Sequence, residues 1–169
     1  LTAVHDVASD LPLVAGDVFR LPFSDACFDG YWSLGVIEHF YQGFQPILAE
    51  AYRVLRPGGV LFLTFPFMSP LRRLKVRRGR YEPLPKDFDP DQNDFYQFAL
   101  DRRLVCHSLK ETGFEIVKKG AFDAVKGLKD EVSFAKGILS HLYSANDLVG
   151  KTLRFVINRS LLHVAGHSA

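Results

Sequence analysis

The pair Glu38-His39 places a carboxylate beside an imidazole, directly after the apolar run Leu34-Gly35-Val36-Ile37. Imidazole takes up and releases a proton near neutral pH, so it suits removal of a proton from an acceptor group. The alternative is a pair at a helix start that only packs or orients the loop. No third residue of metal-ligating type accompanies the pair, and we predict no metal site.

Alternating strands and helices are predicted around this pair. The apolar run 13–16 predicts a buried strand that ends at Asp17, and the aromatic run 28–33 predicts another that ends near Ser33. Residues 60–65 are apolar on both faces, which is typical of an interior parallel strand covered by helices above and below. The apolar spacing over residues 44–55 predicts a helix, which Arg56-Pro57-Gly58-Gly59 ends.

The second half of the chain continues this pattern. Asp101 is predicted to cap a helix that ends at Gly113, and residues 114–119 predict a strand. Residues 133–143 and 148–164 predict helices, although 152–157 also fit a strand. This order predicts an α/β fold with a mostly parallel sheet. Ligands of such folds bind at the carboxyl ends of strands, here at Asp17, at residues 33–39 and from Pro66 onward.

Three segments, in fixed order, resemble the central motifs of a known family. They are residues 14–23 (VAGDVFRLPF), 28–39 (FDGYWSLGVIEH) and 53–59 (RVLRPGG). Together they resemble class I S-adenosylmethionine-dependent methyltransferases, of the type 11-like group that acts on small molecules. The resemblance covers Leu13 to about Lys119, and it implies a Rossmann-like sheet, S-adenosylmethionine as the cofactor and a small-molecule methyl acceptor.

The resemblance also implies roles for individual residues. Asp17 has the position whose carboxylate accepts a hydrogen bond from the adenine amino group, and Val18 offers a backbone donor to the ring. Backbone carbonyls at Leu34 and Gly35 would face the ammonium end of the cofactor. Glu38-His39 resembles the pair of methyltransferases that act on quinone-type hydroxyls. The alternative for Asp17 is that it only holds a turn. The alternative for Leu34 and Gly35 is an ordinary strand-to-helix turn.

Two elements of that family are absent upstream of these segments: the glycine-rich turn near the methionine part of the cofactor, and the strand whose terminal acid holds the ribose. The chain also begins at Leu1 rather than Met. We therefore expect an N-terminally truncated single domain over residues 1–169, lacking the first two strands and perhaps the last. Such a form should be inactive or impaired and should self-associate through an exposed sheet edge.

Positive charge is concentrated in one segment. Six basic residues and no acid lie between Arg72 and Arg80, and the remaining chain carries a net charge of −4. Residues 66–98 are predicted to form a lid or insertion in which these cations pair with Asp87, Asp89, Asp91 and Asp94. The alternative is a non-catalytic module whose basic segment holds an anionic partner; nucleic acid is not expected. Residues 120–169 are predicted to form a helical region.

Composition excludes several classes of protein. Cys27 and Cys106 are the only cysteines, which excludes a zinc ribbon and a disulfide scaffold. The longest apolar stretch is far shorter than the roughly 20 residues that span a bilayer. No signal peptide opens the chain, and we expect a cytoplasmic location.

Overall fold

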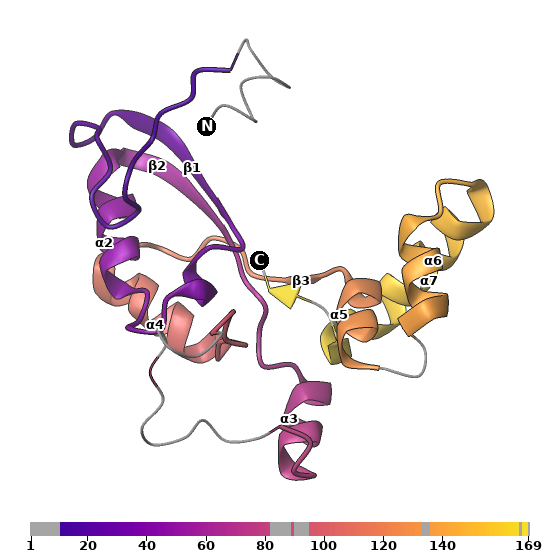
Figure 1. The fold of residues 1–169 in the computed structure, drawn as a ribbon. Helices are drawn as coiled ribbons and strands as arrows, with labels where there is room; N and C mark the ends of the chain where they lie inside the picture. The colour runs from indigo at the N-terminus through magenta and orange to yellow at the C-terminus, as the bar shows by residue number, and fades with distance from the viewer. Residues whose placement is uncertain (1–10, 82–88, 90–94, 133–135, 166, 169) are drawn as a thin grey trace.

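Two parallel strands and two helices form one end of the molecule in a computed structural model that describes residues 11–81, 89, 95–132, 136–165 and 167–168 (Figure 1). Strand β1 (Phe28–Leu34) leads through the 3-10 helix η1 (Ile37–His39) to α2 (Gln45–Val54) and β2 (Leu55–Thr64). Then follow α3 (Pro70–Arg77), α4 (Arg102–Thr112), β3 (Ala121–Phe122), α5 (Ala124–Glu131), α6 (Lys136–Ser144), α7 (Leu148–Ala165) and β4 (His167–Ser168).

The predicted parallel pair of strands is confirmed. Ser33 lies opposite Leu63 in the β1–β2 register, and both are buried. Helices α2 and α4 cover this face, since Ile47, Leu48 and Val105 belong to the same hydrophobic core as Leu63. An α/β architecture with a small parallel sheet therefore positions the carboxyl end of β1, where η1 begins.

The described residues cover only one face of the β1–β2 sheet, so the prediction that residues 60–65 are covered by helices on both faces is wrong for this part of the chain. Side chains alternate along a strand, and Trp32 and Phe62 point away from the core. Their rings lie 5.0 Å apart, with 73% of Trp32 and 41% of Phe62 exposed. The described part of the chain supplies no helix that packs on this outer face.

Helix α2 confirms the apolar spacing read from the sequence. Ile47, Leu48, Ala51 and Val54 are buried, and Pro46 occupies the first turn. The helix gives way to β2 at Leu55, and residues 56–59 form an irregularity within that strand. Gly59 is required there because a Cβ would lie 2.9 Å from the Arg56 carbonyl oxygen.

Helix α4 has the predicted ends. The Asp101 carboxylate accepts a hydrogen bond from the Arg103 amide at 2.7 Å, and Gly113 ends the helix in the left-handed conformation. The prediction of a helix over 148–164 is confirmed by α7, so the alternative strand over 152–157 is wrong. Helix α6 agrees with the prediction from Lys136 onward, while 133–135 lie outside the described residues.

Two predicted strands are wrong. Residues 13–16 form no strand, and Leu13 and Val14 are exposed; residues 114–119 form no strand either, and Val117 is 92% exposed. A strand needs a neighbouring ladder to satisfy its backbone groups, and neither segment has one among the described residues. Apolar, strand-favouring residues alone were therefore not enough to form a strand in these two segments.

Helix α3 carries part of the basic segment and is joined to α5 by a buried ion pair. Arg72 Nε donates to Glu131 Oε1 at 2.6 Å, and Lys75 Nζ lies 2.7 Å from Glu131 Oε2. Tyr81 also donates to this carboxylate. Burial alone would raise the pKa of Glu131, but these donors outweigh it and hold the pKa below its usual range.

The predicted internal pairing of the 66–98 segment was to involve four aspartates. Asp87, Asp91 and Asp94 lie outside the described residues. The acidic partners of three of the basic residues come from outside the segment: Glu131 for Arg72 and Lys75, and Asp101 for Arg73. None of the helices in the described ranges is long and apolar enough to cross a membrane.

The outer face of β1 and β2 predicts self-association, because burying two exposed aromatic side chains against a second copy releases water from both. Sedimentation velocity over a wide concentration range should show a concentration-dependent dimer. The Trp32→Ser/Phe62→Ser variant should weaken it by at least about tenfold, given about 1.5–3 kcal/mol for each buried aromatic. A single monomeric species at all concentrations contradicts the prediction.

Candidate functional site

Asp17 lies in a tight turn ahead of β1. Its Oδ1 accepts a hydrogen bond from the Phe19 amide at 2.9 Å, and its carbonyl accepts one from the Arg20 amide at 2.9 Å. The carboxylate is exposed, and one of its two oxygens holds the turn. The turn-holding role considered from the sequence is therefore present, and Oδ2 is the oxygen left to meet a ligand.

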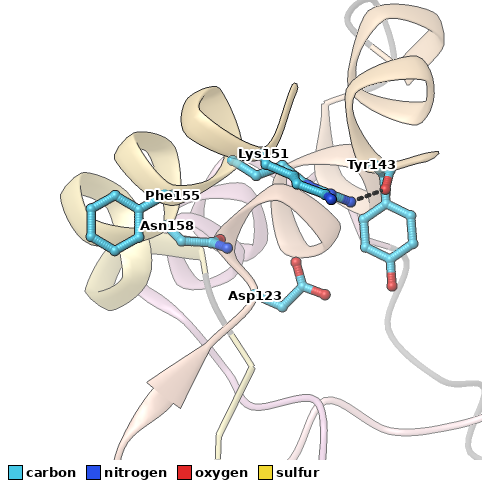
Figure 2. Close-up of a pocket in the computed structure, with 6 residues that line it drawn as sticks. Asp123, Tyr143, Lys151, Phe155 and Asn158 are labelled. Atoms are coloured by element: carbon cyan, nitrogen blue, oxygen red, sulfur yellow. Dashed lines mark hydrogen bonds between the residues drawn. The ribbon is translucent and has the colours of Figure 1, made fainter. Parts of the chain in front are cut away.

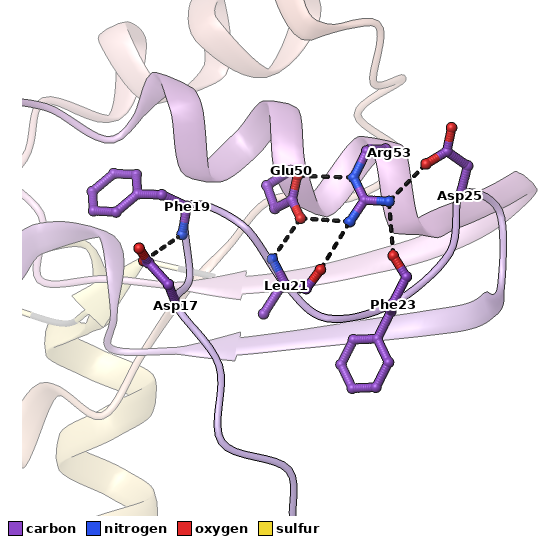
Figure 3. A network of polar contacts seen from close by, with 7 residues as sticks. All are labelled: Asp17, Phe19, Leu21, Phe23, Asp25, Glu50 and Arg53. Atoms are coloured by element: carbon purple, nitrogen blue, oxygen red, sulfur yellow. Dashed lines mark hydrogen bonds and ion pairs between the residues drawn. The ribbon is translucent and has the colours of Figure 1, made fainter.

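Arg53 and Glu50 of α2 fix the chain that follows this turn (Figure 3). The Leu21 amide donates to Glu50 Oε1 at 2.7 Å, while Arg53 donates to the carbonyls of Leu21 and Phe23 at 3.2 and 2.8 Å. Arg53 also pairs with Glu50 and Asp25, each at 2.6 Å. The loop that carries Asp17 is thereby tied to a helix rather than to a strand.

The end of β1 requires a glycine. Gly35 has a φ of +67°, and its amide continues the sheet by donating to the Thr64 carbonyl at 3.1 Å. A Cβ at this position would lie 3.3 Å from Glu38 Oε1. The side chain of Leu34, the residue before Gly35, is exposed. Because Gly35 itself has no side chain, its backbone lies close to the Glu38 carboxylate.

Glu38 is buried with an unsatisfied oxygen. Its side chain is 3% exposed, and Oε2 has no hydrogen-bond partner among the described residues. Burial raises the pKa of Glu38, an effect only partly offset by its own backbone amide and by the charges of His39 and Lys126. A buried oxygen of this kind is suited to accept a proton or a hydrogen bond from a ligand.

His39 is oriented by the backbone of Tyr96. Its Nδ1 lies 2.6 Å from the Tyr96 carbonyl oxygen, which can only accept, so Nδ1 carries the proton. Nε2 is therefore the atom able to take up a proton, and it lies 3.9 Å from Glu38 Oε1. The Tyr96 ring stands edge-on to the imidazole at 5.1 Å.

The predicted site residues gather at one end of the sheet. Phe19, in the Asp17 turn, packs edge-on against Phe40 with ring centroids 4.9 Å apart. Val18 and Phe40 both pack against the same hydrophobic core. The turn is thus brought against the segment that follows Glu38-His39, and Gly35 lies close to the Glu38 carboxylate, since a Cβ there would be 3.3 Å from Oε1.

Two features of this site had weak signals in the sequence. Tyr96 has no motif that marks it as a partner of His39, which is 57 residues away. The Glu50 and Arg53 pair has helical i, i+3 spacing, which predicts their ion pair but not their contacts with residues 21–25. Hollows of about 520 and 640 Å³ open elsewhere. The described residues contain no group of three metal-ligating side chains.

The Arg53 contacts predict a pH-dependent contribution to stability. Arg53 holds the pKa of Glu50 below its usual value of 4.5, so the stabilisation is complete above about pH 4.5 and is lost as the pH falls. Arg53→Met should lower the free energy of unfolding at pH 7 and much less in acid. Denaturant titration from pH 3 to 7 measures this; a difference that does not change with pH contradicts it.

Glu38 is predicted to have the opposite effect on the pH dependence of stability. Its pKa is raised in the folded state, so the ionised carboxylate destabilises the fold above pH 4.5. Glu38→Gln removes the buried charge and keeps the shape of the side chain, so it should raise the free energy of unfolding at pH 7. The gain should disappear in acid. Glu111→Gln, an exposed acid on α4, is the control; equal effects of both variants would count against a buried, costly Glu38.

Comparisons with known proteins show what the chain is similar to. The sequence profile described as "Methyltransferase domain" matches residues 2–63. The ubiquinone/menaquinone biosynthesis C-methyltransferase UbiE of Paracoccus denitrificans is 31% identical over 118 residues, covering 63% of this chain and 47% of that protein. The malonyl-[acyl-carrier protein] O-methyltransferase of Herminiimonas arsenicoxydans is 40% identical over 113 residues, covering 66% and 38%.

The fold agrees with this relationship. A crystal structure of an S-adenosylmethionine-dependent methyltransferase from Archaeoglobus fulgidus matches with a TM-score of 0.56 and 13% sequence identity, covering 98% of this chain and 69% of that one. The chain spans less than half the length of the two curated relatives named above. The chain is therefore similar to S-adenosylmethionine-dependent methyltransferases, and relative to these homologues it is a partial chain.

Proposed function

We propose that the protein containing this chain transfers a methyl group from S-adenosylmethionine to a small-molecule acceptor at the site formed by the Asp17 turn, the Leu34-Gly35 turn and Glu38-His39. The observation that carries the proposal is their juxtaposition at the carboxyl end of β1, where Phe19 packs against Phe40. Ligands of parallel α/β sheets bind at this edge.

Two details support a bound ligand at this edge. The buried Oε2 of Glu38 lacks a partner among the described residues, and Gly35 keeps a Cβ away from the same carboxylate. Asp17 would accept a hydrogen bond from the adenine amino group through Oδ2, and the Val18 backbone would contact the ring. The carbonyls at Leu34 and Gly35 would face the ammonium group.

Glu38 and His39 are proposed to act on the acceptor. When bound, S-adenosylmethionine supplies an electrophilic methyl carbon, which the acceptor atom attacks as the bond to sulfur breaks. His39 Nε2 would receive the proton that the acceptor loses, because the Tyr96 carbonyl keeps the proton of the imidazole on Nδ1. Glu38 would stabilise the imidazolium that results, since its Oε1 lies 3.9 Å from Nε2.

The two relatives represent two acceptor classes, since one is named a ubiquinone/menaquinone biosynthesis C-methyltransferase and the other a malonyl-[acyl-carrier protein] O-methyltransferase. A base such as His39 would serve either reaction, by removing a proton from a hydroxyl before O-methylation or from an acidic carbon before C-methylation. The 169-residue chain alone is expected to bind S-adenosylmethionine weakly and to be inactive or impaired, since only part of the cofactor's surface would be contacted. We also expect a cytoplasmic protein.

The alternative, a non-catalytic module that holds an anionic partner through residues 72–80, gains no specific support from the described residues. Three of the six basic side chains already have acidic partners, because Arg72 and Lys75 pair with Glu131 and Arg73 pairs with Asp101. We therefore keep the proposal that residues 66–98 form a lid or insertion beside the acceptor site.

Asp17 is tested by two substitutions in the full-length protein. Asp17→Ala should weaken cofactor binding by about 1–3 kcal/mol, the scale of a hydrogen bond to a charged group, with a smaller effect on turnover at saturating cofactor. Asp17→Asn keeps an oxygen for the Phe19 amide and separates loss of the turn from loss of the charge. Calorimetry measures both; an unchanged dissociation constant for both variants would return Asp17 to a turn-holding role.

His39 is tested by its effect on the pH profile. His39→Gln should lower turnover by about 10²–10⁴-fold, the usual contribution of a general base, and should remove the limb of the profile that falls in acid. Cofactor affinity should stay unchanged. His107→Gln, an exposed histidine on α4, is the matched control. Normal turnover with the acid limb intact would exclude His39 as the base.

A further inference from the structure

An apolar face on the helical end of the molecule is left uncovered. Helix α7 exposes Leu148, Val149, Leu153, Phe155 and Val156, with Leu148 81% and Phe155 65% exposed. Ile138 on the adjoining α6 is 77% exposed. Leu148, Phe155 and Val156 follow i, i+7, i+8 spacing, so they form one stripe along the helix. Helices α6 and α7 lie together, apart from β1 and β2 (Figure 1).

Positive charge lies along the edge of this stripe. Residues 136–165 contain four basic residues and one acid, Asp147. Lys151, Arg154 and Asn158 follow i, i+3, i+7 spacing on the flank of α7, next to Phe155. A face that combines exposed apolar side chains with flanking cations and almost no acid is complementary to an apolar surface bordered by anionic groups.

A hollow of about 520 Å³ lies on the same flank (Figure 2). Lys151, Arg154, Phe155 and Asn158 of α7 line it, together with Asp123 and Tyr143. Asn158 Oδ1 accepts from the Val125 amide and Arg154 donates to the Tyr143 carbonyl, so α5 and α6 hold these two side chains in place. Lys129 stands over the Tyr143 ring at 4.6 Å and adds a further positive charge nearby.

The one acid of the hollow is already engaged. Asp123 caps α5 by accepting the Lys126 amide through Oδ1 at 3.0 Å. The cations of Lys151 and Arg154 therefore exceed the acidic charge in the lining, and Lys151 has no acidic partner among the described residues. Such a hollow favours a phosphate group that also carries hydroxyl or ammonium donors for Asp123, as glycerophospholipid headgroups do.

We propose that the α6–α7 face binds an anionic lipid surface, with Phe155 and Leu148 entering the interface and the hollow at Lys151 and Arg154 receiving a headgroup phosphate. This goes beyond the methyl transfer proposed above and does not depend on it, because none of the residues of the cofactor and acceptor site lies on these helices. Charge supplies the attraction and apolar burial holds the face in place.

Vesicle flotation with the 169-residue chain, without cofactor, tests the proposal. Phosphatidylcholine vesicles containing phosphatidylglycerol should carry the protein, phosphatidylcholine alone should carry much less, and added salt should release it. Phe155→Ser should reduce partitioning by about tenfold, and Lys151→Gln by about fivefold. Both side chains are exposed, so neither change should alter the circular dichroism spectrum.

Matched controls come from another exposed segment. Val117→Ser and Lys118→Gln remove an exposed apolar and an exposed basic side chain outside α6 and α7, and they should leave partitioning unchanged. Equal loss in the control variants would overturn the proposal, as would absence of binding to anionic vesicles. Binding of soluble glycerol 3-phosphate without vesicle binding would also overturn it, as would a dimer abolished by Phe155→Ser with no vesicle binding.

Discussion

The contacts of Arg53 with Glu50 and the 21–25 loop are the interaction on which the candidate site depends. A loop without ladder partners must satisfy its amides and carbonyls in another way, and one guanidinium with one carboxylate does so for Leu21 and Phe23. Both side chains project from α2, which also contributes Ile47 and Leu48 to the hydrophobic core. The position of the Asp17 turn is thereby set by the packing of a helix.

Contacts connect this loop to the residues proposed to act on the acceptor. The fixed loop places Phe19 against Phe40, and Phe40 follows the buried Glu38 and the oriented His39. The Phe98 amide donates to the Glu38 carbonyl at 2.9 Å, and Leu100 forms a parallel bridge with Phe67, in the segment that follows β2. Glu38 lowers the stability of the fold, because its Oε2 is buried without a hydrogen-bond partner among the described residues. A cost of this kind at the edge where ligands bind is consistent with selection for binding or catalysis.

Local signals predicted much of this architecture. The buried stripe of α2, the Asp101 cap and Gly113 stop of α4, and the aromatic strand β1 depend on residues a few positions apart, so the sequence displays them directly. Ser69 followed by Pro70 carried a similar start signal for α3 that was not recognised. Asp17, Gly35 and Glu38-His39 were singled out by residue chemistry and by their place after predicted strands, and the motif resemblance supplied the roles that are proposed for them.

Non-local partners explain what sequence reasoning missed. The runs 13–16 and 114–119 have strand-like composition but no neighbour to pair with in the described chain. The partner of Arg72 is Glu131, 59 residues away, rather than the nearer aspartates that charge balance suggested. The covering of residues 60–65 was misjudged for the same reason, because the apolar pattern of a strand does not reveal whether a layer packs on its second face.

Amide chemical-shift mapping tests the central claim most directly, since it detects even weak binding and reports its location. S-adenosylhomocysteine at millimolar concentration, titrated into the isotope-labelled 169-residue chain, should shift the amides of residues 17–20 and 34–39, with smaller effects at Leu21 and Tyr96. Arg53→Met should diminish the shifts at 17–20 while leaving those at 34–39. Shifts confined to other segments, or no shift in either group, would contradict the account of a cofactor site at the carboxyl end of β1.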